Sequence, residues 1–226
     1  MNGDTAPEAP RRIAILASSG GNLRSHGGSD PARLISDVAR QVEAAGFVLE
    51  EVQFVAAAAS MDGVTQSTPA ALWGLDGSGP QILQEGPLFE INSLARENDE
   101  RLAARVRAGE IDGLIVMSHD PGDTNAQTVA AAAAAEIPAA GTGGSSLATA
   151  QQMGLRVVSA SGTTGTTSST RAVSAVSGLA RHWKVTYRPR LGGTSSEGPG
   201  AEGDEPAWKR ISIRGIMVGA IPAFIA

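Results

Sequence analysis

Cysteine is absent from the 226-residue chain, which excludes disulfides, cysteine nucleophiles and thiolate metal sites. Aromatic residues make up only 4% of the chain, so alanine, valine, isoleucine and leucine must form most of the core. No basic run stands out, and the net charge is -5, which argues against nucleic acid as the main partner. These absences fit a cytoplasmic protein.

Long hydrophobic runs are also absent. Residues 1–10 are polar and contain proline; they lack the apolar centre of a signal peptide and predict a disordered tail. The stretch from Gly215 to Ala226 is nearly all apolar, but a membrane-spanning helix needs about 20 such residues. Two interpretations remain open for this stretch: a buried strand pair, or the beginning of a membrane helix.

Apolar runs alternate along the chain with segments of helical spacing, which predicts an α/β fold. We expect a doubly wound, mainly parallel sheet with helices on both faces. The predicted strands cover residues 13–17, 47–59, 114–117, 137–140 and 156–159. The predicted helices cover residues 32–45, 91–108, 125–136, 147–153 and 171–182.

Three segments outside this pattern complete the predicted organisation. Residues 60–87 are rich in glycine, proline, serine and aspartate, and predict a long irregular excursion. The helix over residues 91–108 is expected to carry its charges on its outer face, at Glu97, Asp99, Glu100, Arg101 and Arg105. The α/β domain is predicted to span 11–190, followed by a flexible linker over 191–206 and an apolar segment over 207–226.

Loops of small and hydroxyl-bearing residues follow several predicted strands. Residues 141–146 and 161–170 consist almost wholly of glycine, serine and threonine, and residues 118–124 form a third polar loop. Backbone N–H groups and hydroxyls at helix N-termini form anion sites. Because the carboxyl ends of parallel strands share one edge of a sheet, we expect these loops to lie at the ligand-binding edge.

The order of these loops resembles the SIS (sugar isomerase) family. Residues 116–124 (Val-Met-Ser-His-Asp-Pro-Gly-Asp-Thr) resemble its serine-rich S-x-S-G-x-T loop, and residues 144–148 (Gly-Ser-Ser-Leu-Ala) resemble its G-S-S-L-A element. Residues 168–172 (Ser-Ser-Thr-Arg-Ala) resemble its A-S-T-K-A element, and residues 15–20 are similar to its first strand and loop. Pro121 and Asp120 depart from the family pattern, and the family's catalytic glutamate has no counterpart that we could place.

The resemblance implies a three-layer phosphosugar-binding domain that forms a homodimer. The phosphate would be bound by Ser118, Gly122, Asp123 and Thr124, and the G-S-S element Gly144, Ser145 and Ser146 would contribute to the same site. The sugar side would be lined by Ser18, Ser19, Ser168 and Ser169, with Thr170 beside them. His119 is the one candidate acid or base for aldose/ketose isomerisation.

Two alternatives remain beside this prediction. The chain could be the cytoplasmic domain of a membrane transporter, attached through its C-terminal end from about residue 215. It could instead be a degenerate domain that keeps only the fold and its dimer contacts. Neither metal-ligand spacing nor a dinucleotide fingerprint is present, so we expect no metal and no cofactor.

Overall fold

The computed structural model describes residues 9–17, 31–57, 65–117, 122–142, 148, 150–158 and 167–190. The chain divides into two units, Met1–Gly193 and Thr194–Ala226, and all described residues belong to the first. The predicted apolar segment over 207–226, the linker over 191–206 and most of the predicted N-terminal tail therefore lie outside the described residues.

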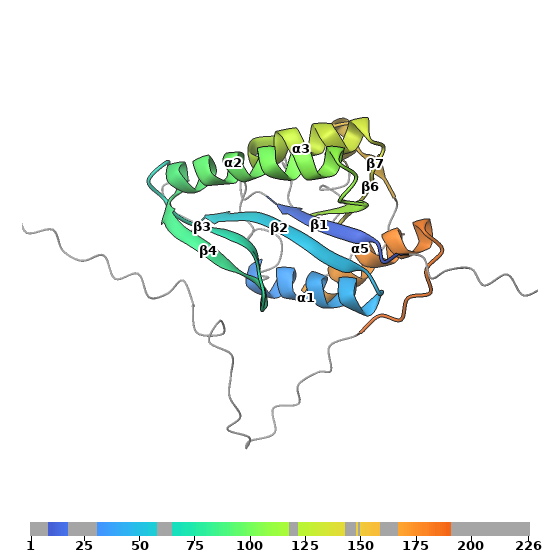
Figure 1. Cartoon of the computed structure of the whole chain (residues 1–226). Helices are drawn as coiled ribbons and strands as arrows, with labels where there is room; N and C mark the ends of the chain where they lie inside the picture. Colours follow the sequence, from blue (N-terminus) through green and yellow to red (C-terminus); the bar gives the residue numbers. More distant parts are fainter. Residues whose placement is uncertain are drawn as a thin grey trace, which may run out of the picture. The chain divides into compact units, whose positions relative to one another are not determined.

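Seven strands form one mixed sheet in the order β4-β3-β2-β1-β5-β6-β7 (Figure 1). The strands are β1 (Arg12–Ala17), β2 (Val48–Ala57), β3 (Pro69–Asp76), β4 (Gly79–Pro87), β5 (Gly113–Val116), β6 (Pro138–Gly141) and β7 (Arg156–Val157). The four pairs that link β2, β1, β5, β6 and β7 are parallel, and β3 is antiparallel to both β2 and β4. The predicted α/β class with a mainly parallel sheet is confirmed at this level.

Helices cover both faces of the sheet (Figure 1). They are α1 (Pro31–Ala44), α2 (Leu88–Arg107), α3 (Gly122–Ala134) and α5 (Ser168–His182). The side chains of β1 point alternately to the two faces of the sheet, and each face has its own apolar core. Ile13 and Ile15 pack with α1 and α5, while Ala14 and Leu16 pack with α2 and α3. All four side chains are fully buried, as expected for a central strand that is covered on both faces.

The predicted irregular excursion over residues 60–87 is wrong for its second half, which forms the hairpin of β3 and β4. Residues along β3 alternate between buried and half-exposed positions, which is the period of a strand. The Asp76-Gly77-Ser78-Gly79 sequence supplies the turn: the Asp76 carboxylate accepts the Ser78 N–H at 2.8 Å. Glycine and proline, which we took as loop signals, here belong to a turn and an edge strand.

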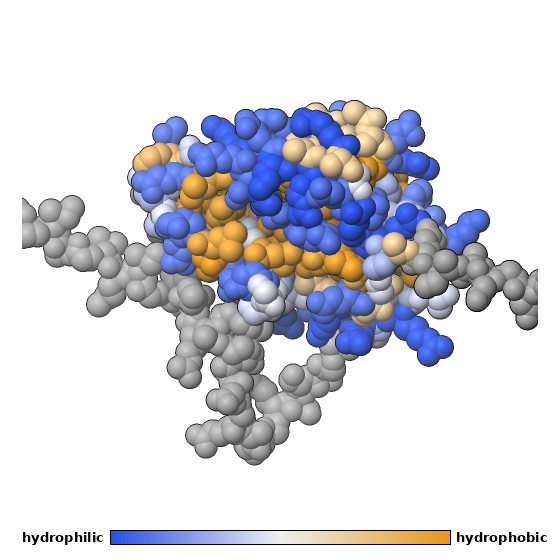
Figure 2. All heavy atoms as spheres, in the orientation of Figure 1, coloured by the Kyte–Doolittle hydropathy of each residue, from blue (hydrophilic) through white to orange (hydrophobic). Residues whose placement is uncertain are grey.

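The β4 strand lies at one edge of the sheet. Its register with β3 shifts between Leu72, opposite Gln84, and Trp73, opposite Ile82, so Leu83 is the extra residue of a β-bulge. Figure 2 shows apolar side chains gathered between the two helical layers. The exposed large apolar residues of the described part are Val48 on β2, Leu83 on β4, and Phe89 and Leu94 on α2.

After α5 the chain turns back across α1 and is held there by Gln41. This glutamine is fully buried. Its Nε2 donates to the Arg190 carbonyl at 2.6 Å, and its Oε1 accepts the Arg190 N–H at 3.1 Å and the Tyr187 hydroxyl. A buried amide that uses both ends in this way fixes residues 183–190 against the helix.

Candidate functional site

The carboxyl edge of the parallel strands is the natural place for a ligand. The chain passes from β1 to β2 on one side and from β5 to β6 on the other, while β1 and β5 are neighbours. In open α/β sheets, ligands bind where the strand order reverses in this way. The edge beyond β1 and β5 is therefore the candidate site.

Seven of the thirteen predicted site residues lie outside the described part of the chain. This holds for Ser18, Ser19, Ser118, His119, Gly144, Ser145 and Ser146. Gly122 and Asp123 form the first two residues of α3. Thr124, Ser168, Ser169 and Thr170 can be placed with their side chains.

Thr124 lies in a buried polar cluster at the beginning of α3. Its carbonyl accepts the Gln53 side-chain amide at 3.1 Å, and that amide also donates to the Ala95 carbonyl at 2.8 Å. The Asn125 amide donates to the Thr124 hydroxyl at 3.3 Å. Gln53 thereby ties β2 to both helices on this face and fixes the beginning of α3.

Asn125 marks a kink in α3. Its φ of -130° and ψ of 22° are not helical, so the first turn of α3 is separated from the rest of the helix. The side chain is fully buried, and its Oδ1 has no hydrogen-bond partner among the described residues. An acceptor of this kind is uncommon in a folded interior and points to a missing donor.

The straight part of α3 is capped by a carboxylate from another helix. Asp99 on α2 accepts the N–H groups of Gln127 and Thr128, each at 2.9 Å. Its carbonyl accepts the Thr128 hydroxyl at 3.2 Å. The kink leaves these N–H groups without a partner inside the helix, and the Asp99 carboxylate accepts them instead.

The expected outward position of Asp99 is wrong: the residue is 3% exposed and faces α3. It shares the buried face of α2 with Ile91, Ala95, Leu102 and Val106. The sequence shows this spacing, but a charged residue is ordinarily expected on the outer face of a helix. Its partners lie 28 and 29 residues further along the chain.

The hydroxyls at the beginning of α5 also have an internal partner. Ser168 and Ser169 both donate to Asp37 Oδ2 on α1 at 2.8 Å. Asp37 forms an ion pair with Arg40 at 2.6 Å. The N-cap is Thr167, whose hydroxyl accepts the Thr170 N–H at 3.3 Å. These contacts dock α5 on α1, as a cap and a packing contact require.

The helices that carry Thr124 and Ser168 cover opposite faces of the sheet. The core on one face includes Val129 of α3, and the core on the other includes Ala172 of α5. Thr124 lines a pocket of about 330 Å³ together with residues of α2 and α3, and Ser168, Ser169 and Thr170 do not line it. Within the described part of the chain, the structure does not bring these predicted residues into one pocket.

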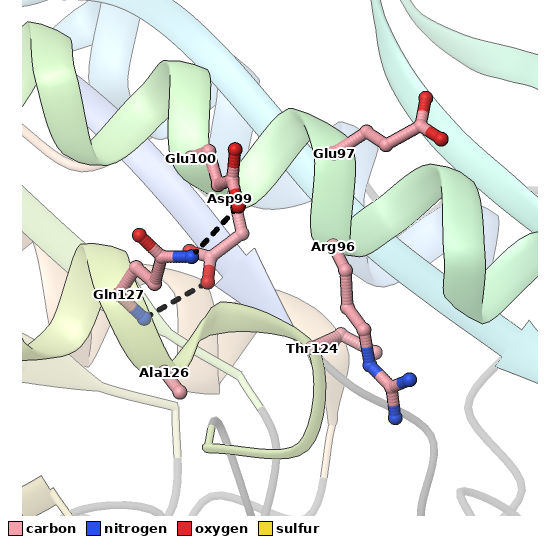
Figure 3. A pocket seen from close by; sticks show the side chains of 7 residues that line it. All are labelled: Arg96, Glu97, Asp99, Glu100, Thr124, Ala126 and Gln127. Atoms are coloured by element: carbon pink, nitrogen blue, oxygen red, sulfur yellow. Dashed lines mark hydrogen bonds between the residues drawn. The ribbon is translucent and has the colours of Figure 1, made fainter.

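That pocket lies between α2 and the beginning of α3 (Figure 3). Its lining residues are Arg96, Glu97, Asp99, Glu100, Thr124, Ala126 and Gln127. The Arg96 side chain extends past Thr124, while Glu97 points away from both (Figure 3). Glu100 accepts the Gln127 side-chain amide at 3.2 Å.

Arg96 is the residue that our sequence reasoning missed. It is exposed and has no ion-pair partner within the described residues. The sequence offered one signal: a basic residue directly before the acidic residues Glu97, Asp99 and Glu100. Nothing in the sequence connects that position to the loop over residues 118–124, because the contact joins two helices.

Among the residues that the structure describes, no three histidine, aspartate or glutamate side chains gather as metal ligands do. No described helix is long and apolar enough to cross a bilayer. Comparison with family models, curated proteins and solved structures finds no match to this chain. The resemblance to SIS domains therefore stays a prediction.

Proposed function

We propose that the chain binds a phosphorylated sugar or a similar small anion at the carboxyl edge of its parallel strands, in an SIS-like domain. The phosphate would lie beside Arg96 and the first turn of α3. The expected site over residues 118–124 leads directly into that turn.

The observation that carries this proposal is the position of Arg96. Its side chain runs alongside the buried Thr124 toward the beginning of α3 (Figure 3). An arginine presents several N–H donors in a planar arrangement that matches phosphate oxygens. No described carboxylate pairs with it, so its charge is available to a ligand.

The kink at Asn125 supports the same placement. Asp99 caps the helix only after the kink, at Gln127 and Thr128. The N–H groups of the first turn are not among its partners, and N–H groups at a helix N-terminus favour negative charge. Arg96 and this turn would contact the phosphate from two sides.

The hydroxyls of α5 would suit a different part of the ligand. Because Ser168 and Ser169 both donate to Asp37, their remaining capacity is to accept hydrogen bonds. Such groups match the hydroxyls of a sugar better than phosphate oxygens. We assign no isomerase step, since His119 lies outside the described residues.

Thermal denaturation with sugar phosphates and with inorganic phosphate tests this proposal, because a ligand that binds the folded state raises the melting temperature. Arg96→Gln is expected to weaken binding about 10- to 100-fold, since hydrogen bonds to charged groups contribute about 1.5–3 kcal/mol. Arg107→Gln is the matched control: it removes an exposed base from the same helix, away from the pocket. Equal affinities of the two variants would contradict the site.

One observation favours a purely structural domain as the second candidate. Two of the helices at the carboxyl edge already receive carboxylates from inside the chain: Asp99 at α3 and Asp37 at α5. Such contacts stabilise the fold without any ligand. This candidate predicts that neither sugar phosphates nor inorganic phosphate changes the melting temperature of the parent protein.

A further inference from the structure

Exposed basic side chains occur on β7, at the end of α5 and along residues 183–190. No aspartate or glutamate occurs between Glu136 and Glu197, whereas six arginine or lysine residues do. Five of these six are exposed, and we call them the basic surface: Arg156, Arg181, Lys184, Arg188 and Arg190.

Several contacts bring the basic surface together from separate elements. Gln41 fixes Tyr187 and Arg190 against α1. Arg156 on β7 lies close enough to the end of α5 to act on His182: burial lowers the pKa of His182, and the charges of Arg156 and Arg11 lower it further. The sequence shows no dense basic run, because folding creates the cluster.

Few carboxylates oppose this charge. The neighbouring elements carry Asp37 and Asp112, which are paired with Arg40 and Arg12, and the exposed Glu43 and Glu136. Among the described residues, Glu43 and Glu136 form no ion pair with the basic surface. On α2, by contrast, Arg101 and Arg105 are paired with glutamates.

We propose that the basic surface docks on the head groups of a membrane that contains anionic lipid. Basic residues near such a surface each contribute to binding through the negative surface potential.

The aromatic residues favour lipid over single-stranded nucleic acid as the partner. Binding of single strands depends on exposed aromatic rings that stack on bases. Trp183 instead packs edge-on against Phe47, with ring centroids 5.3 Å apart, and Tyr187 is half-buried with its hydroxyl on Gln41. Neither ring is presented to a base.

Flotation of the full chain with vesicles tests the proposal. The vesicles are phosphatidylcholine alone, or phosphatidylcholine with phosphatidylserine, each at low and high salt. We expect binding only to the serine-containing vesicles, and weaker binding at high salt because ions screen the attraction. The Lys184→Gln/Arg188→Gln variant should bind about 30-fold more weakly, which corresponds to about fivefold for each base removed.

Arg101→Gln/Arg107→Gln is the matched control, since it changes the net charge equally on α2, and it should bind like the parent. Three results would overturn the proposal: no binding to serine-containing vesicles, equal binding to both vesicle types, or equal losses in the two variants.

Duplex DNA serves as a competing probe. Loss of DNA binding in the Lys184→Gln/Arg188→Gln variant, with vesicle binding unchanged, would assign the surface to nucleic acid instead. Because sugar-phosphate binding is measured separately, neither proposal depends on the other.

Discussion

Among single residues, Gln41 and Tyr187 show how one buried amide holds a segment that belongs to no helix or strand. The Tyr187 hydroxyl donates to Gln41 Oε1, and burial raises the pKa of this phenol to about 12. Ionisation would place a negative charge against the carbonyl oxygen of the amide. The neutral phenol is therefore part of the contact that keeps residues 183–190 on α1.

We predict that Tyr187 ionises near pH 12 in the folded protein and near its ordinary value of 10.0 in denaturant. Because the folded pKa is the higher one, this residue stabilises the fold fully below about pH 10, and the contribution is lost as pH rises toward about 12. Tyrosinate absorbance reports this directly, since the chain contains one tyrosine. A folded-state midpoint at the denatured value would contradict the buried contact.

Asp99 shows where prediction from sequence stops at this scale. Its spacing with Ile91, Ala95 and Leu102 fits the inner face of α2, yet a carboxylate is seldom buried without a partner. The partner is the beginning of another helix, which no local pattern reveals. The same reason explains why Arg96 was missed and why Ser168 was expected to face a ligand rather than Asp37.

At the scale of elements, a carboxylate from a neighbouring helix contacts α3 just after its kink, and another contacts the first turn of α5. The Asp99 carboxylate joins α2 to α3, and the Asp37 carboxylate joins α1 to α5. Each contact satisfies groups at a helix N-terminus and fixes how two helices pack. On one face this contact is a cap on backbone N–H groups, and on the other it joins side chains only.

We predict that Asp99→Ala lowers the free energy of unfolding by about 2–3 kcal/mol, because the N–H groups of Gln127 and Thr128 lose their acceptor. Asp99→Asn, which keeps one acceptor oxygen, should fall between this variant and the parent. Urea denaturation measures both. Glu97→Ala, an exposed change on the same helix, should stay within about 0.5 kcal/mol. Similar losses at residues 97 and 99 would disprove the capping role.

Elements with a strong period were predictable, and those interrupted by glycine and proline were not. The five parallel strands and α1, α2, α3 and α5 are confirmed within a few residues at each end. The β3 and β4 hairpin was missed because Pro80, Gly86 and Pro87 resemble loop signals, although edge strands tolerate them. The predicted loops at the carboxyl edge mostly remain predictions, since their residues lie outside the described part.

Across the whole molecule, burial falls from the centre of the sheet toward the β4 edge. Residues 13–17 in β1 and residues 114–116 in β5 are fully buried, whereas Leu83 on β4 is 48% exposed. Local unfolding costs less free energy in regions with few buried apolar contacts than in the core. The hairpin is therefore expected to be the less stable part of the sheet.

We predict that amide hydrogens of β4 exchange with solvent much faster than those of β1 and β5. Hydrogen exchange followed by mass spectrometry gives this order peptide by peptide. The peptide covering α2 provides an internal reference, because its inner face is anchored by Ile91 and Leu102. Equal protection of β4 and β1 would indicate that something covers the edge.

The two outer strands also limit how this protein can associate with itself. At one margin, β4 carries Pro80, Pro87 and the bulge at Leu83; at the other, β7 spans only two residues in the described part. Within the described residues, neither edge offers a long, regular ladder of unpaired backbone groups to another chain. The described edges are therefore poor templates for strand-by-strand association, whether in a homodimer, which stays a prediction, or in a growing fibril.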